Sequence, residues 1–101
     1  MKKIIVTGGS GFIGSNLVNF FIRKKFFVIN LDKLTYSSNR YHNEKRNSRN
    51  YKFIKVDIVN KEKITKIIRK YKPIVIFNLA AEPHVDRFID GPYNFIQTNI
   101  N

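Results

Sequence analysis

The chain has 101 residues, a formal net charge of +12 and no cysteine. This length allows a single domain, and the missing cysteines exclude a disulfide scaffold, a Cys-ligated zinc site and a thiol nucleophile. The hydrophobic share of 43% and the aromatic share of 14% exclude a disordered basic tail. The longest apolar stretch, residues 74–81, is too short to span a bilayer, and no export signal opens the chain, so a cytoplasmic protein is expected.

The positive charge has two explanations that the composition leaves open. A selected basic surface would bind nucleic acid or an anionic membrane. Alternatively, the abundant residues Lys, Asn, Ile, Phe and Tyr all have A/T-rich codons, so mutational drift would raise the charge without selection. The lysines are spread along the chain and form no single block, which favours drift. We therefore expect neither a nucleic acid nor a membrane as a partner.

Four short apolar runs, rich in β-branched and aromatic residues, predict β-strands. The first run is closed by glycines, and the second and third end at Asp32 and Asp57. The fourth is continuous in apolar residues, which is typical of a parallel sheet covered on both faces. The predicted strands comprise residues 4–7, 26–31, 53–56 and 74–77.

Helical patterns lie between these strands. Residues 12–24 carry an uneven apolar stripe, which predicts a first helix. Asn60 is a candidate N-cap for a second helix, which Pro73 prevents from continuing. Residues 33–50 are polar and predict a long loop, and a last helix is expected to begin near Pro92.

This alternation predicts an α/β fold, the N-terminal portion of a Rossmann-type doubly wound parallel sheet with about four strands in one domain, residues 1–101. Right-handed crossovers place the first strand inside the sheet, the second and third strands on one side of it and the fourth on the other. Ligands bind at the switch point between the first and fourth strands. Because no later strand is expected within the chain, the outer edge of the fourth strand is predicted to be unpaired and prone to aggregation.

The strongest local motif is a glycine-rich turn between the first strand and the first helix. Residues 7–14, Thr-Gly-Gly-Ser-Gly-Phe-Ile-Gly, match G-x-G-x-x-G at Gly9, Gly11 and Gly14 and G-x-x-G-x-x-G at Gly8, Gly11 and Gly14. A turn without Cβ atoms lets the backbone approach a pyrophosphate, whose charge meets the N–H groups at the start of the helix. Its place between a strand and a helix favours dinucleotide binding over an ordinary tight turn.

Acidic residues at two strand ends add to this motif. Asp32 ends the second strand, where a carboxylate accepts hydrogen bonds from the ribose hydroxyls of an adenosine. A 2′-phosphate would meet a like charge there, which favours NAD over NADP, and Lys33 and Arg40 would soften that repulsion. Asp57 ends the third strand, where it would receive the adenine amino group or, as the open alternative, form a turn or helix entry.

Three blocks of sequence resemble one family. They are the glycine motif with residues 31–36, Leu-Asp-Lys-Leu-Thr-Tyr; residues 80–87, Ala-Ala-Glu-Pro-His-Val-Asp-Arg; and residues 89–99, which begin Ile-Asp-Gly-Pro and end Gln-Thr-Asn. The chain resembles the N-terminal part of an extended short-chain dehydrogenase/reductase, most of all the dTDP-glucose 4,6-dehydratase family. The resemblance implies NAD as cofactor, a nucleoside-diphosphate sugar (dTDP-glucose) as substrate of the full-length enzyme, and a homodimer.

The resemblance also implies contacts residue by residue. Phe12 and Ile13 would give backbone N–H groups to the pyrophosphate, residues 32–35 would hold the ribose, and residues 79–82 would line the nicotinamide ribose. His84 would face the sugar nucleotide, with a structural role as the open alternative. The implied NAD-binding residues are Gly8, Gly11, Phe12, Ile13, Gly14, Asp32, Lys33, Leu34, Thr35, Asp57, Ile58, Leu79, Ala80, Ala81, Glu82 and Thr98, and the implied substrate-binding residues are Pro83 and His84.

The family's reaction requires groups that this sequence does not supply. It draws a hydride from sugar C4 onto NAD, eliminates water across C5–C6 and returns the hydride to C6. The superfamily's catalytic Tyr-x-x-x-Lys sits on a later helix, so the literal matches at residues 41–45 and 51–55 are interpreted as coincidences. No catalytic residue and no metal site is predicted here, and the 101 residues alone are expected to be inactive.

Three departures, at Pro83, Phe88 and Val56, and two alternatives accompany the resemblance. Phe88 replaces a small residue. Pro83 stands where the family usually has Ser, which removes a hydroxyl and a backbone donor at the substrate edge. Val56 stands beneath the expected adenine, where Gly is common. The alternatives are another NAD-dependent sugar-nucleotide epimerase or dehydratase, and a non-catalytic module that is a vestigial dinucleotide binder or a basic binding domain.

Overall fold

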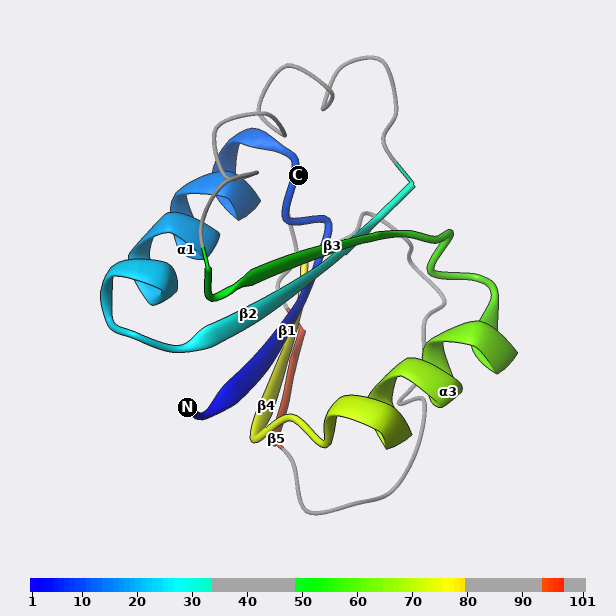
Figure 1. Ribbon diagram of the computed structural model, residues 1–101. Helices are drawn as coiled ribbons and strands as arrows, with labels where there is room; N and C mark the ends of the chain where they lie inside the picture. Colours follow the sequence, from blue (N-terminus) through cyan, green and yellow to red (C-terminus); the bar gives the residue numbers. More distant parts are fainter. Residues whose placement is uncertain (34–48, 80–93, 98–101) are drawn as a thin grey trace.

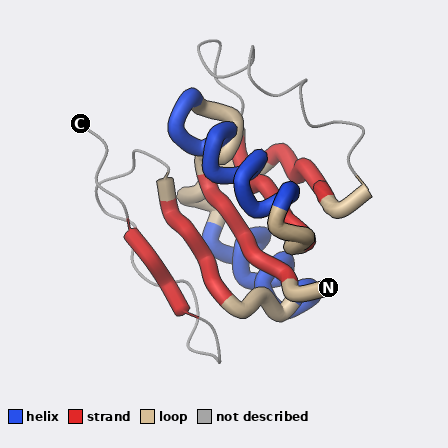
Figure 2. Tube along the Cα trace, turned by 90° about the vertical axis from the view of Figure 1, so that its left-hand side faces the viewer, coloured by secondary structure: helices blue, strands red, loops and turns tan. Residues whose placement is uncertain are grey.

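The computed structural model describes residues 1–33, 49–79 and 94–97 of the chain. In these ranges a five-stranded sheet lies between two helices, α1 (Phe12–Arg23) and α3 (Lys61–Tyr71). The strands are β1 (Lys3–Thr7), β2 (Phe27–Asp32), β3 (Tyr51–Lys55), β4 (Val75–Asn78) and β5 (Asn94–Gln97). The two helices lie on opposite faces of the sheet (Figure 1, Figure 2).

The order of the strands confirms the predicted doubly wound topology. The sheet runs β3-β2-β1-β4-β5, and every neighbouring pair is parallel. β1 therefore lies inside the sheet, with β2 and β3 on one side of it and β4 on the other. The four predicted strands are all present, with ends that differ from the prediction by one or two residues. The Rossmann-type α/β fold expected from the sequence is confirmed.

Alternate residues of the strands build two cores, one on each face of the sheet. Successive side chains of a strand point to opposite faces, so a strand covered on both faces is apolar throughout. The core beneath α3 contains Ile5, Ile29, Leu31, Val56, Ile58, Ile64, Ile67, Ile68 and Ile76. The core beneath α1 contains Ile4, Val6, Val18, Val28 and Leu79.

The second helix begins and ends where the sequence predicts. The side chain of Asn60 accepts a hydrogen bond from the backbone N–H of Lys63 at 3.2 Å, as an N-cap does. Lys72 ends the helix in the left-handed conformation, with φ of 49°, directly before Pro73. Glu62 in the first turn complements the positive end of the helix dipole.

The prediction of a last helix that begins near Pro92 is wrong for residues 94–97, which form the strand β5. This strand pairs with β4, with Val75 opposite Asn94 and Asn78 opposite Gln97. Asn94 also donates its backbone N–H to the carbonyl of Ile74 at 3.0 Å. The backbone groups of β4 lack partners on this side without β5, and satisfying them outweighs the local preference for a helix. The prediction that the outer edge of β4 is unpaired is therefore wrong as well.

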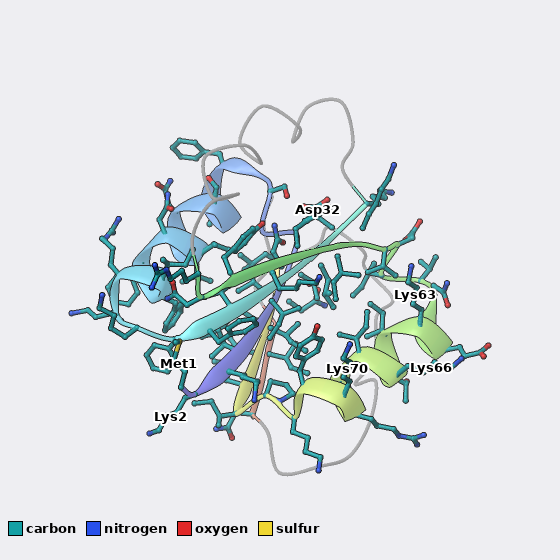
Figure 3. The ribbon with its side chains drawn as sticks, viewed as in Figure 1. Met1, Lys2, Asp32, Lys63, Lys66 and Lys70 are labelled. Carbon is teal, nitrogen blue, oxygen red and sulfur yellow. The ribbon has the colours of Figure 1, made fainter. Side chains whose placement is uncertain are left out.

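The basic side chains of α3 lie on the molecular surface. Lys63, Lys66 and Lys70 lie on this helix, on the face of the sheet opposite α1 (Figure 3). Lys66 forms an ion pair with Glu62 at 3.5 Å, and because both side chains are more than 70% exposed it adds little stability. No helix in the described part of the chain is long and apolar enough to cross a membrane.

Candidate functional site

The carboxyl ends of β1, β2 and β4 lie side by side at the switch point of the sheet. In the parallel ladders Thr7 at the end of β1 is level with Leu31 of β2 and with Asn78 of β4. The strand order reverses between β1 and β4, and in open parallel sheets ligands bind at such a switch point. Asp32 ends β2 at this same end of the sheet, near the start of α1 (Figure 3). This is the place where the sequence predicts the ligand.

The glycine turn, residues 8–11, leads from β1 into α1 and needs two of the motif's glycines for its own geometry. Gly8 has φ of 75°, in the left-handed region that favours glycine. A Cβ on Gly14 would lie 2.2 Å from the carbonyl oxygen of Gly8, so only glycine lets the helix pack on the turn. These positions are fixed by the fold, whether or not a ligand binds.

The two other glycines of the motif differ in what surrounds them. A Cβ on Gly9 would lie 2.4 Å from the side-chain oxygen of Asn30, so residue 9 is restricted by a buried neighbour. Among the described residues, a Cβ on Gly11 would meet only the carbonyl oxygen of Gly8, at an ordinary 3.7 Å, and Gly11 has φ of −76°. Neither packing nor backbone conformation requires glycine at position 11. This sets Gly11 apart from Gly9 and Gly14, where an added Cβ would overlap other atoms.

The start of α1 lacks the capping that α3 has. Gly11 is the N-cap of α1 and makes no side-chain capping bond, and no acidic residue lies in the first turn. α3 in contrast has Asn60 as its cap and Glu62 in its first turn. The first N–H groups of a helix have no intrahelical acceptor and attract an anion. Phe12 and Ile13 are 64% and 50% exposed, so this end of α1 is open to solvent.

Asp32 contacts the glycine turn directly. Its Oδ2 atom accepts a hydrogen bond from the backbone N–H of Ser10 at 3.0 Å. The side chain is partly exposed, which leaves it accessible to a ligand at the end of the sheet. The acid that the sequence singles out as the ribose ligand thus lies next to the turn predicted to hold the pyrophosphate.

A buried polar network lies behind the turn. The side-chain amide of Asn30 donates one hydrogen bond to Ser10 Oγ and one to the Tyr51 hydroxyl, both at 3.0 Å. Burial raises the pKa of Tyr51 above its usual value of 10.0; the hydrogen bond from Asn30 opposes this rise, and the charge of Asp32 adds to it. The network links β2 and β3 to the turn.

The end of β1 is joined to the end of β4 by a second buried pair. The hydroxyl of Thr7 donates a hydrogen bond to the side-chain oxygen of Asn78. Both residues are at most 1% exposed. Leu79 follows directly, is buried, and donates its backbone N–H to the carbonyl of Thr7 at 2.9 Å. Leu79, one of the residues expected near the nicotinamide ribose, is therefore held at the switch point.

Asp57 and Ile58 have structural roles in the described part of the chain. Asp57 Oδ1 accepts the backbone N–H of Val59 at 3.1 Å, so the turn role that the sequence left open is observed. Ile58 is buried in the core beneath α3. Lys33 is exposed directly after Asp32. The remaining predicted residues lie outside the described residues, namely Leu34, Thr35, Ala80, Ala81, Glu82, Pro83, His84 and Thr98.

Sequence reasoning missed the residues that support the turn. Asn30 and Asn78 are polar residues inside apolar runs, and this is the signal that marks them as buried hydrogen-bonding groups. Tyr51 was noted only as part of a coincidental Tyr-x-x-x-Lys match. Tyr51 and the exposed Lys55 lie at opposite ends of β3. This separation agrees with the interpretation of the match as a coincidence. In the described ranges, no three His, Cys, Asp or Glu side chains gather as a metal site requires.

The chain is similar to known proteins over nearly its whole length. It is 51% identical to dTDP-glucose 4,6-dehydratase of Haemophilus influenzae and 49% identical to that of Escherichia coli, over 99% and 97% of this chain. It spans only about 30% of the length of the curated relatives it matches.

Solved structures show the same relationship. The crystal structure of dTDP-glucose 4,6-dehydratase from Bacillus anthracis in complex with NAD matches with a TM-score of 0.74 and 39% identity, over 81% of this chain and 27% of that one. UDP-glucose 4-epimerase from Thermotoga maritima with UDP-glucose matches with a TM-score of 0.68 and 34% identity, over 80% of this chain and 25% of that one. The family model described as GDP-mannose 4,6 dehydratase matches residues 5–101. The resemblance noted in the sequence is confirmed, and the chain belongs to the GDP-mannose 4,6 dehydratase family.

Proposed function

We propose that the chain is the NAD-binding portion of a cytoplasmic dTDP-glucose 4,6-dehydratase. The single observation that carries this proposal is Gly11, a glycine at the start of α1 that neither packing against the described residues nor backbone conformation requires. Similarity to dehydratases at about half of all positions supports the reaction class. The substrate of the full-length protein would be a nucleoside-diphosphate sugar, dTDP-glucose, and the full-length protein would be a homodimer.

The cofactor's pyrophosphate would lie against the glycine turn. The backbone N–H groups of Phe12 and Ile13, at the positive end of α1, would donate to its oxygens, and Gly8 and Gly14 keep helix and turn close together. Charge-assisted hydrogen bonds of this kind are stronger than neutral ones, so the N–H groups supply more of the affinity than the helix dipole. The ligand would then act where Gly11, the N-cap of α1, supplies no capping side chain.

The adenosine half would lie toward β2 and β3. Asp32 would accept hydrogen bonds from the ribose hydroxyls and keep the hydrogen bond from the N–H of Ser10. Residues 33–35 would lie beside the ribose. Asp57 and Ile58 would flank the adenine through the loop that follows β3. A 2′-phosphate would approach the Asp32 carboxylate, so NAD is preferred over NADP.

The nicotinamide half and the sugar would lie toward the end of β4. Leu79 to Glu82 and Thr98 would line the nicotinamide ribose, and Pro83 and His84 would contact the sugar nucleotide. Bound NAD supplies a hydride acceptor. Proton transfer and water elimination would depend on groups beyond these 101 residues, so the chain alone is expected to bind NAD without converting dTDP-glucose.

The glycine at position 11 tests this proposal. Gly11→Ala is expected to keep the midpoint of urea unfolding within error of the unaltered chain, because the new methyl group meets only an ordinary contact. The same variant is expected to weaken NAD binding about tenfold or more in titration calorimetry, because the methyl group fills the phosphate approach. Gly14→Ala is the matched control and should unfold the chain, since its Cβ would overlap the turn backbone. Unchanged NAD affinity in Gly11→Ala, or no NAD binding by the unaltered chain, contradicts the proposal.

A further inference from the structure

Three polar side chains from separate elements meet in the interior behind the glycine turn. Asn30 of β2 and Ser10 of the turn are each 1% exposed. The side-chain nitrogen of Asn30 lies 3.0 Å from Ser10 Oγ and 3.0 Å from the Tyr51 hydroxyl on β3. Because Ser10 and Asn30 are buried, their side chains are shielded from a ligand that arrives from solvent at the end of the sheet.

The amide of Asn30 is not explained by stability alone. Its Oδ1 atom is buried and has no hydrogen-bond partner, which opposes folding. This oxygen occupies the place that a Cβ on residue 9 would take, at 2.4 Å, so Asn30 also forces glycine there. A buried polar group with an unpartnered atom calls for a role beyond packing.

Both hydrogen-bonding groups of Ser10 that face β2 are held by that strand. The backbone N–H of Ser10 donates to Asp32 Oδ2 at 3.0 Å, and its hydroxyl accepts from Asn30. Asn30 and Asp32 are two residues apart on one strand, so their side chains point to the same face. Gly8 adds a backbone bond to the carbonyl of Leu31 at 2.8 Å. The residue just before Gly11 is thus fixed from both its main chain and its side chain.

Tyr51 controls the orientation of the amide at the centre of this network. An amide nitrogen carries two hydrogens in one plane, and here one hydrogen is directed to Tyr51 and the other to Ser10. Without the Tyr51 hydroxyl one hydrogen of the buried amide loses its partner, and the amide rotates more freely. The bond to Ser10 weakens as a result.

We propose that Asn30 and Tyr51 are positioning residues, which act through Ser10 to fix the glycine turn and thereby set the affinity for the pyrophosphate of a nucleotide. The inference rests on the proposed function for its ligand. Its structural part, that a hydroxyl on β3 orders a turn on the other side of β2, is independent of any ligand.

Hydrogen exchange of the ligand-free chain tests the structural part. Tyr51→Phe keeps the ring and removes the hydroxyl, and is expected to speed exchange of the Ser10 and Gly11 amides about 3- to 10-fold, while residues 4–6 keep their protection. Tyr71→Phe is the matched control, because Tyr71 stacks on Phe27 beneath α3, on the other face of the sheet. Unchanged exchange at Ser10 and Gly11, or an equal rise throughout β1, overturns the proposal.

Binding of ADP and of adenosine tests the ligand part. Ser10→Ala and Tyr51→Phe are each expected to weaken ADP binding about 3- to 10-fold and to leave adenosine binding within about twofold, since only ADP carries a pyrophosphate. The double variant should lose no more than Ser10→Ala alone, because Tyr51 acts through Ser10. The proposal is overturned if a variant loses as much affinity for adenosine as for ADP. It is also overturned if the loss of ADP affinity in the double variant is the product of the losses in the two single variants. If the unaltered chain binds neither ADP nor NAD, the proposed function fails and the exchange experiment still decides whether Tyr51 positions the turn.

Discussion

The hydroxyl of Thr7 donates a hydrogen bond to the side-chain oxygen of Asn78 and so joins the ends of β1 and β4 where the strand order reverses. Ligands of open parallel sheets bind beside the carboxyl ends of the strands at this reversal. The pair is separated by 71 positions in the sequence. It therefore joins the ends of the two strands through a contact that only the folded chain can make.

Replacement of Thr7 by Val is expected to destabilise the chain. The shape of the side chain is kept, but the buried hydrogen bond from Thr7 to Asn78 is lost, which costs about 1–3 kcal/mol of unfolding free energy. Urea unfolding followed by circular dichroism measures the loss. Thr65→Val on α3 is the matched control, because Thr65 is only partly buried and lies on another element. Equal midpoints for the two variants would contradict the importance of the Thr7–Asn78 pair.

Replacement of Asp32 by Ala is expected to weaken NAD binding by about 1–3 kcal/mol, because the N–H of Ser10 and, in the proposed complex, the ribose hydroxyls lose their acceptor. Asp32→Asn keeps an acceptor and removes the charge, so it should also narrow the preference for NAD over NADP. Calorimetric titration with both cofactors measures the two effects. Equal affinity of the unaltered chain for NAD and NADP would show that Asp32 does not select the cofactor.

Replacement of Asn60 by Ala is expected to lower the unfolding free energy by about 1 kcal/mol. The variant removes the hydrogen bond from the N–H of Lys63, which leaves the first turn of α3 without its cap. Asn16→Ala in α1 is the control, since Asn16 is exposed and bonds only to a carbonyl of its own helix. The midpoint temperature of thermal unfolding should be clearly lower for Asn60→Ala than for Asn16→Ala. The reverse order would argue against the cap.

The stability of the chain is expected to fall above pH 10 through Tyr51. Burial raises the pKa of Tyr51 in the fold above 10.0, so above that pH the unfolded chain releases a proton that the folded chain keeps. The unfolding free energy therefore decreases as the pH rises through this window and is unaffected by Tyr51 below it. Tyr51→Phe should flatten this decrease above pH 10 in urea unfolding, whereas the unaltered chain should keep it. Identical slopes for the unaltered chain and Tyr51→Phe would refute this role.

The local features of the fold could be predicted from the sequence because their signals are local. Apolar runs predicted the strands β1 to β4. The periodic apolar residues of α3, with Asn60 as a candidate cap before them, predicted that helix. The right-handed crossover rule then predicted the strand order. Asp32 lies at the end of β2, beside the glycine turn, as its place after an apolar run predicted. Each of these inferences needs only neighbouring residues and general rules of chain geometry.

The features that were missed depend on contacts between distant segments. Nothing near Thr7 indicates Asn78 as its partner, and nothing near Ser10 indicates Asn30 and Tyr51. β5 was missed for a related reason, because four residues that fit a helix locally form a strand once the side of β4 offers unpaired backbone groups. In each case the satisfaction of buried polar groups decided the structure, and that demand is visible only after the chain has folded.

The two outer strands of the sheet differ in how well they resist the addition of another chain. β3 stands at one end of the strand order and carries Lys52 and Lys55, both exposed. β5 stands at the other end, and its sequence Asn-Phe-Ile-Gln contains no charge. Lysines on an outer strand oppose pairing with a foreign strand, because their charge would be buried in the contact. Of the two outer strands in the described part of the chain, β3 is therefore the one whose side chains oppose the addition of a second polypeptide.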